Sequence, residues 1–191
     1  MGGPKHRISP IAPPEIGIHG IHPVARTFHH DPRGFLVETM RADDPDGLGS
    51  RFRMSYSSLT QPGRYRDEDR WHLHRVQTDR FVVVLGEMIL ALCDHRPESP
   101  THDRLAVVRM SGAAYSGAGG PGAPSPTTSY LVPIPPGVLH CIGNLSDRPF
   151  LLTNFPTELY DARDEGRVPF GERTIPSLDG PFSWDLVDRP G

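Results

Sequence analysis

Apolar residues along this chain fall in short runs bounded by turn residues, not in long periodic stretches. The 22 prolines and 20 glycines interrupt the sequence so often that no window long enough for a core helix shows helical spacing of apolar positions. The runs instead favour β-strands at 34–40, 51–59, 80–85, 88–93, 105–110, 129–132, 138–142 and 150–155. Their number and spacing predict an all-β protein, either a barrel or a double-sheet jelly roll, with a short C-terminal irregular or helical segment.

The length of 191 residues suits one domain with a sizeable core and two tails. We expect the domain to span residues 21–184, with a loosely ordered segment at 1–20 and a tail at 185–191. The low-complexity stretch SGAAYSGAGGPGAPSPTT, residues 111–128, is expected to form a flexible loop inside the domain.

The charge and the cysteine content narrow the classes of partner. A net charge of -3 and a pI near 6.3 provide no broad basic field for nucleic acid or for an anionic membrane. No apolar run approaches the roughly 18 residues of a membrane helix, and the N-terminus lacks an apolar signal core. Two cysteines, Cys93 and Cys141, fit a reduced compartment. We therefore expect a cytoplasmic protein whose partner is a small molecule, with no nucleic acid or membrane partner.

Two histidines one residue apart stand out in RWHLHRVQTDRFVVVLG, residues 70–86. Residues i and i+2 of a strand point to the same face, so His72 and His74 can both enter a barrel interior with Leu73 turned away. Asp79 follows, and a Pro-Pro-Gly turn later precedes His140. Two interpretations stay open: these four residues bind one divalent Fe, Mn, Ni or Zn ion, or they line the barrel and form hydrogen bonds without a metal.

The two histidine stretches resemble the two cupin motifs, here H-x-H-x4-D-x6-G with Asp79 where glutamate is commoner, and P-x-G-x2-H-x3-N. The resemblance implies the cupin double-stranded β-helix. Three longer stretches, FHHDPRGFLVETMR, GEMILALCDHRPESPT and LVPIPPGVLHCIGNLSDRPFLL, resemble the dTDP-4-keto-6-deoxyglucose (dTDP-4-dehydrorhamnose) 3,5-epimerase family. This resemblance spans roughly residues 20–184.

Resemblance to this epimerase family implies a homodimer whose first strands cross to the partner subunit, and a sugar-nucleotide pocket inside the barrel. Arg33 and Glu38 are candidate contacts to the nucleotide, and Arg70 and Arg96 are further candidate substrate contacts. The family's reaction needs a base that removes a proton next to the C4 ketone and an acid that reprotonates the other face. It also needs a cation at the enolate oxygen. His74 falls at the position of the base.

The other family roles have no direct match in this sequence. The family's lysine falls near Asp79, which reverses the charge. Its tyrosine falls at a leucine or asparagine of FLLTNFPTELYD, with Tyr160 several residues later as the candidate acid. The aspartate that partners the histidine lies after the tryptophan in the family, and this chain reaches Gly191 without it. Candidate replacements are the cations Arg64, Arg66, Arg70 and Arg75 and the acids Tyr56, Tyr65 and Tyr160. Gaining His72 and Asp79 shifts the pattern toward a metal that would itself act as Lewis acid on a carbonyl or enolate oxygen.

The predicted function is that of a divergent epimerase or isomerase acting on a keto-deoxysugar nucleotide, or a similar polyoxygenated metabolite, by proton abstraction next to a carbonyl. One alternative is a metal-dependent oxygenase, lyase or cyclase of secondary metabolism, which predicts stoichiometric metal. The other is a non-catalytic cupin that binds a small molecule without turnover. No organic cofactor is expected.

Overall fold

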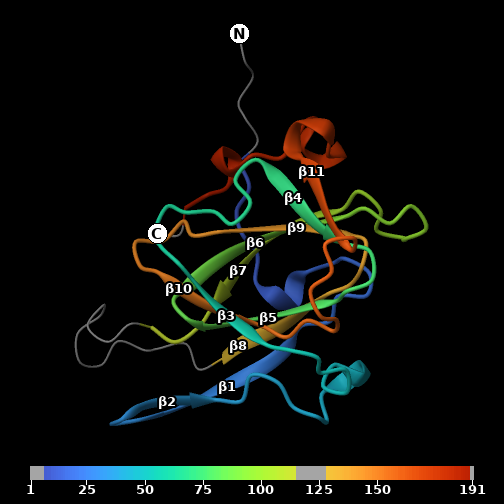
Figure 1. The fold of residues 1–191 in the computed structure, drawn as a ribbon. Coiled ribbons are helices and arrows are strands. Elements are labelled where there is room, and N and C mark those ends of the chain that lie inside the picture. Colours follow the sequence, from blue (N-terminus) through green and yellow to red (C-terminus); the bar gives the residue numbers. More distant parts are fainter. Residues whose placement is uncertain (1–6, 115–127, 190–191) are drawn as a thin grey trace.

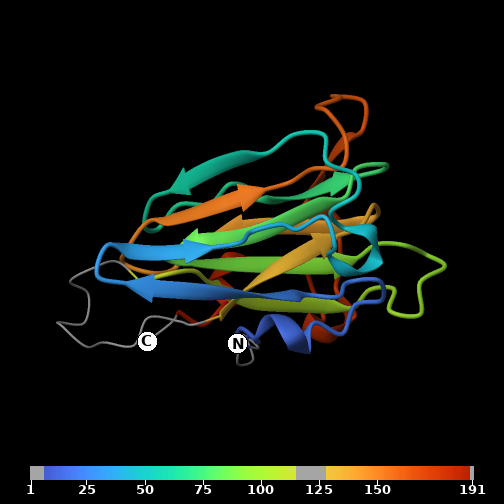
Figure 2. The same ribbon diagram turned by 90° about the horizontal axis from the view of Figure 1, so that it is seen from below.

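A computed structural model describes residues 7–114 and 128–189, which form two stacked antiparallel sheets (Figures 1 and 2). The first sheet has six strands in the order β2-β1-β8-β5-β10-β3, and the second has five in the order β11-β4-β9-β6-β7. The strands are β1 (Val24–Asp31), β2 (Gly34–Val37), β3 (Tyr56–Thr60), β4 (Arg70–His74), β5 (Asp79–Leu85), β6 (Glu87–Asp94), β7 (Leu105–Ser111), β8 (Thr128–Ile134), β9 (Val138–Gly143), β10 (Phe150–Asn154) and β11 (Glu165–Pro169). The predicted double-sheet jelly roll is confirmed.

The main core lies between the two sheets. Alternate residues of β6 point inward, so Met88, Leu90 and Leu92 pack against Val83 of β5 and Val132 of β8. All five side chains are fully buried. This core joins the two sheets. Strands β5, β9 and β10 contribute residues both to the core and to the polar site.

A second apolar cluster covers the outer face of the five-stranded sheet. Trp71, Cys93 and Cys141 of that sheet pack against Phe182 and Trp184 of the C-terminal segment. Short 3-10 turns build this segment: η3 (Phe170–Glu172), η4 (Pro176–Leu178) and η5 (Trp184–Leu186). The predicted C-terminal helical segment therefore forms, and it fixes one face of β4 by burying Trp71.

The N-terminal segment is tied to the domain more closely than its composition indicates. Ile16, Ile18 and Ile21 are buried in the main core, and Ile8 forms a bridge to Val187 near the other end of the chain. Further short turns, η1 (Pro13–Glu15) and η2 (Pro45–Gly47), lie before β1 and before β3. Spaced isoleucines among prolines gave no strand or helix signal, but they supply apolar surface to the core.

Most of the predicted strands form near the predicted positions. The predicted strand at 51–59 begins only at Tyr56, and the one at 34–40 ends at Val37. Strands β1 and β11 were not predicted, because their polar sequences lack apolar alternation. Strand β4 was expected only from its two histidines and not from an apolar run. Of the predicted flexible loop at 111–128, residues 115–127 lie outside the described residues.

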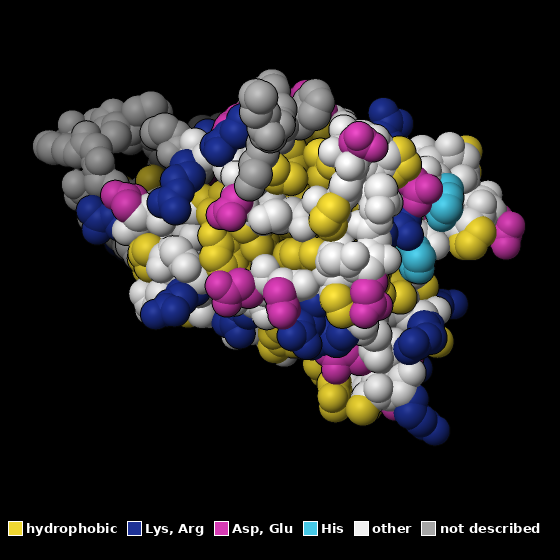
Figure 3. All heavy atoms as spheres, turned by 90° about the horizontal axis from the view of Figure 1, so that it is seen from above, with side chains coloured by type: hydrophobic (Ala, Val, Ile, Leu, Met, Phe, Trp, Pro, Cys, Tyr) yellow, Lys and Arg dark blue, Asp and Glu magenta, His cyan; other side chains and the backbone are white. Residues whose placement is uncertain are grey.

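Seen from above, the surface mixes acidic and basic side chains with apolar ones between them (Figure 3). This face therefore carries no uniform basic field. In the described ranges no helix is both long enough and apolar enough to cross a membrane.

Candidate active site

Strand alternation on β4 separates the two faces of the WHLH stretch. Trp71 and Leu73 pack into the outer apolar cluster, whereas His72 lies opposite His140 in the register of β4 and β9. The ring centroid of His72 is 4.6 Å from that of His74 and 4.9 Å from that of His140. The structure thus brings all three imidazoles together on the inner face of the five-stranded sheet.

A cavity of about 350 Å³ opens between the sheets beside these histidines. Its walls come from both sheets and from the loop before β4, so that a ligand would lie between two facing layers. The lining residues are Tyr56, Ser58, Arg66, Asp67, His72, Asp79, Phe81, His140, Ile142, Leu152, Glu165 and Arg167.

His74 is oriented by a carboxylate. Its Nδ1 lies 3.0 Å from Asp164 Oδ2, in the loop just before β11. The backbone N–H groups of Arg75, Val76 and Gln77 also donate to the Asp164 carboxylate, at 2.8, 2.7 and 3.2 Å. Burial opposes ionisation of this group, but the three N–H donors and His74 outweigh it and lower the pKa of Asp164. A fixed carboxylate therefore holds Nδ1–H of His74 and leaves Nε2 as the basic nitrogen.

Asp79 forms the centre of a buried polar network behind the cavity. Its Oδ1 accepts hydrogen bonds from Gln77 Nε2 and Asn154 Nδ2, both at 2.8 Å, and its Oδ2 lies 3.5 Å from His74 Nε2 and 3.4 Å from His140 Nε2. Burial disfavours the charged form, yet His140, His74 and Asn154 lower the pKa of Asp79 to about 2. An ionised Asp79 stabilises a proton on either neighbouring imidazole.

The Nε2 atom of His74 is covered in the ligand-free protein. Gln77 Nε2 lies 3.0 Å from it, and since the same amide donates to Asp79, the pair is an N–H to nitrogen hydrogen bond. His74 consequently sits one layer behind the cavity wall. Catalytic hydrogen bonds are often rearranged in the absence of substrate, so this cover does not disqualify His74 as a base.

His72 faces the cavity directly. Its Nε2 forms no hydrogen bond within the described residues and lies 3.1 Å from Glu165 Oε1. Burial, together with the neighbouring His140 and the charge of Arg167, lowers the pKa of His72 to about 2. His72 is therefore neutral at physiological pH.

The residue types and their spacing also suit a metal ion. The ligand nitrogens of His72, His74 and His140 lie within 4.8 Å of one another, with Asp79 beside two of them. His140 Nδ1 lies 3.2 Å from Val138 O, which fixes its tautomer and leaves Nε2 facing Asp79. Against this, a metal ligated by His74 Nε2 would have to displace the Gln77 amide.

Two arginines supply positive charge to the cavity. Arg66 donates only to the neutral acceptors Thr60 Oγ1 and Leu59 O, at 3.2 and 3.0 Å. Arg167 donates to Glu165 Oε1 at 2.6 Å and pairs with Asp67 at 3.3 Å. Since Arg66 has no carboxylate partner among the described residues, its charge is the one available to an anionic ligand.

The four candidate substrate contacts predicted from the sequence lie away from this cavity. Arg33 pairs with Asp31, Glu38 with Arg41 and Arg70 with Asp69, all on the surface. Arg33 and Glu38 flank β2, the edge strand of the six-stranded sheet. Arg96 instead donates to the fully buried Asp94 at 2.7 Å. Within one chain, Arg96 therefore has a structural position and the other three are surface residues.

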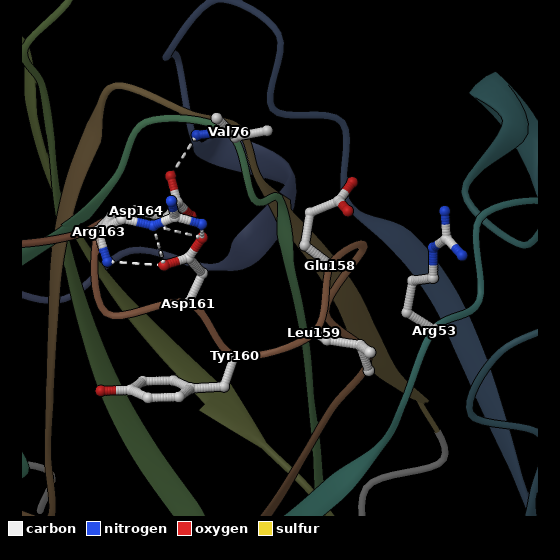
Figure 4. Close-up of a pocket in the computed structure, with 8 residues that line it drawn as sticks. All are labelled: Arg53, Val76, Glu158, Leu159, Tyr160, Asp161, Arg163 and Asp164. Atoms are coloured by element: carbon white, nitrogen blue, oxygen red, sulfur yellow. Dashed lines mark hydrogen bonds and ion pairs between the residues drawn. The ribbon is translucent and has the colours of Figure 1, made fainter.

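Tyr160 lines a different pocket, of about 580 Å³, with Arg53, Val76, Glu158 and Asp164 among its neighbours (Figure 4). Its side chain is 73% exposed, and its hydroxyl lies 3.5 Å from Glu165 Oε2. Tyr56, by contrast, lines the cavity beside the histidines.

The sequence analysis looked for the aspartate partner of His74 only after the tryptophan, where the family has it. In the structure the carboxylate that contacts His74 is Asp164, which lies before the tryptophan, between Tyr160 and β11. A motif count along the chain missed Asp164 because the contact joins residues 90 positions apart through a loop of irregular sequence. The sequence analysis also missed Gln77 and Asn154, whose amides donate to Asp79. A single Gln or Asn in a sequence gives no sign that it will take part in such a network.

Comparisons with known proteins identify the family and the fold. No family model matches the chain. A probable low-salt glycan biosynthesis epimerase, Agl13 of Haloferax volcanii, is 32% identical over 162 residues, which cover 80% of this chain and 88% of that protein. The solved structure of a dTDP sugar isomerase from Desulfovibrio desulfuricans G20 has a TM-score of 0.70 at 26% identity, covering 90% of this chain and 95% of the other.

A second solved structure, that of NovW, a 4-keto-6-deoxy sugar epimerase from Streptomyces spheroides, has a TM-score of 0.66 at 20% identity. The match covers 91% of this chain and 80% of the NovW chain. The fold and the inward-facing histidines define a cupin. Within the cupins, this chain belongs to the family of sugar epimerases related to dTDP-4-dehydrorhamnose 3,5-epimerase, as a divergent member, and it is an isomerase by class.

Proposed function

We propose that the cavity between the sheets binds a keto-deoxysugar nucleotide and that His74 moves a proton at a carbon next to the carbonyl. The observation that carries this proposal is the pairing of His74 with Asp164 beside a cavity that also contains Arg66. The relatives that act on dTDP sugars, by the names they bear, support the substrate class.

His74 is suited to the role of base once substrate displaces Gln77. The Asp164 carboxylate keeps the proton of the neutral ring on Nδ1, so Nε2 accepts the substrate proton. The resulting imidazolium is stabilised by Asp164 on one side and by Asp79 on the other. His72, neutral and facing the cavity, then serves as a hydrogen-bonding contact to the sugar.

The enolate oxygen needs a cation, and the family's lysine position holds Asp79 instead. Arg66 is the cavity cation without a carboxylate partner among the described residues, so we assign it the developing negative charge or the adjacent diphosphate.

The proposal is tested by incubating the protein with dTDP-4-keto-6-deoxyglucose and related keto-sugar nucleotides, and by following the stereochemistry of the product by NMR. We expect epimer or isomer formation from at least one of them, reduced about 10²- to 10⁴-fold in His74→Asn. Tight binding without any change in product would support the non-catalytic alternative.

We further propose that the protein acts as a cytoplasmic homodimer. The β1–β2 hairpin ends the six-stranded sheet (Figure 1). Its side chains Phe35 and Leu36 are 38% and 61% exposed. An edge strand with apolar side chains is suited to pairing with a second copy. A Leu36→Asp variant should shift the mass measured by light scattering from that of a dimer toward 21.1 kDa.

A metal site is the second candidate, favoured by the three convergent imidazoles. The Nε2 atoms of His72 and His140 also form no hydrogen bond in the part of the chain that the structure describes. His72, His74, His140 and Asp79 would hold an Fe, Mn, Ni or Zn ion, which would supply Lewis acidity toward a carbonyl oxygen. In that state Arg66 and Tyr56 would still face the substrate from the other wall.

A further inference from the structure

Tyr56 stands on the opposite wall of the cavity from the histidines. It belongs to β3 of the six-stranded sheet, whereas His72, His74 and His140 belong to β4 and β9 of the five-stranded sheet. A flat enolate lying between the sheets would therefore present one face to the imidazoles and the other to Tyr56.

The phenol of Tyr56 lies next to the strand on which the family has its acidic tyrosine. Sequence resemblance places the family's tyrosine shortly after Phe150 of β10, at a leucine or an asparagine, and neither residue type can give a proton. Strand β3 is the direct neighbour of β10, and Tyr56 is the residue paired with Asn154. Tyr56 therefore supplies a hydroxyl to this cavity from β3, the strand next to the one where the family has its tyrosine.

Asn154 fixes which way the phenol hydrogen points. Its Oδ1 accepts from the backbone N–H of Arg80 at 2.9 Å, and its Nδ2 donates to Asp79 Oδ1 at 2.8 Å. Because one partner can only donate and the other is an ionised acceptor, the amide cannot be flipped. The second Nδ2 hydrogen then goes to Tyr56 Oη at 3.0 Å. Tyr56 accepts this bond, and within the described residues its own proton is not donated to any group.

Tyr56 also carries its proton at the pH at which it would act as an acid. Its partial removal from water raises the pKa of Tyr56, so the phenol keeps its proton at neutral pH. The Asn154 hydrogen bond would in turn stabilise the phenolate that forms when the proton leaves.

We propose that Tyr56 gives the proton to the substrate carbon on the face opposite the histidines. This inference rests on the proposed function. His74 removes the α proton, and the C–H electrons form the enolate. The Tyr56 O–H bond then breaks as a new C–H bond forms on the other face, and the phenolate regains its proton from water.

The test compares wild-type protein with Tyr56→Phe in deuterated water, using dTDP-4-keto-6-deoxyglucose or whichever keto-sugar nucleotide the wild type converts. Exchange of the α hydrogen for deuterium and inversion at that carbon are both measured by NMR. We expect inversion to fall at least about 100-fold, while exchange with retention changes far less. The base can still remove a proton and return deuterium to the same face.

Tyr130→Phe is the matched control, since Tyr130 lies on β8 and lines another pocket. Melting temperature and dTDP binding of Tyr56→Phe establish that the variant is folded and binds ligand. Equal loss of exchange and inversion in this variant, unchanged inversion, or loss of inversion in Tyr160→Phe instead, would each overturn the assignment of Tyr56. A wild type that exchanges deuterium without inversion overturns it as well but leaves the proposed function standing. No exchange in the wild type with any substrate contradicts the proposed function itself.

Discussion

His74 Nδ1 lies 3.0 Å from Asp164 Oδ2, although 90 residues separate the two in sequence. The same carboxylate accepts hydrogen bonds from three successive backbone N–H groups that follow His74. Asp164 therefore fixes both the imidazole and the turn that leads from β4 toward β5. This double contact gives the pair a structural and a chemical role at once.

Replacing Asp164 by asparagine separates these two roles. The amide keeps an oxygen for the N–H donors, but its neutral group no longer stabilises a proton on His74. We expect kcat to fall about 10²- to 10⁴-fold with a much smaller change in KM. Steady-state kinetics with any substrate that the wild type converts measures this split. If KM instead rose by a similar factor while kcat stayed unchanged, Asp164 would serve substrate binding only.

Arg96 is predicted to act on stability and not on substrate. It donates to Asp94 through Nε and Nη2, and Asp94 is fully buried. Arg96→Ala should lower the free energy of unfolding by about 2 to 4 kcal/mol, because a buried carboxylate loses its charged partner. Denaturant unfolding measures this loss, and KM should stay within about twofold of the wild-type value. A tenfold rise in KM would return Arg96 to the substrate site.

The same pair predicts an acid dependence of stability. Burial raises the pKa of Asp94, but Arg96, Ser99 and Thr101 outweigh it and hold the pKa far below its usual range. A group whose folded pKa is depressed stabilises the fold above its unfolded pKa of about 4, and this contribution is lost as the pH falls further. The stability difference between wild type and Arg96→Ala should therefore shrink from pH 6 to pH 2.5. If the stability difference between the two proteins grew as the pH fell, the assignment of Arg96 as the partner of an ionised Asp94 would be contradicted.

Metal content distinguishes the two candidate chemistries. Elemental analysis of protein purified without a metal-affinity tag, repeated on His72→Ala and His140→Ala, measures it directly. About one transition metal per chain, lost in both variants, is the result expected if the three imidazoles form a ligand cluster. Gln77→Ala should then bind metal more tightly, since the amide no longer covers His74 Nε2. Metal retained in both histidine variants would place it elsewhere.

Sequence patterns predicted the fold and the histidines of the site, but they did not predict Asp164 or single out Tyr56. Alternation in WHLH placed His72 and His74 on one face and Leu73 on the other, because the period of a strand is fixed by its backbone. The position of Asp164 depends on how the loop before β11 folds back on β4, which no local pattern encodes. Tyr56 was one of three tyrosines that the sequence could not rank, and only the pairing of β3 with β10 brings it to the cavity.

Deuterium exchange tests the central claim most directly. Wild-type protein and His74→Asn are each incubated with a keto-sugar nucleotide in deuterated water, and the hydrogen next to the carbonyl is followed by NMR. The account predicts that wild type replaces this hydrogen by deuterium at a rate proportional to protein concentration, and that His74→Asn is at least about 100 times slower. Exchange at the wild-type rate in His74→Asn, or no exchange by wild type with any substrate that binds, would contradict it.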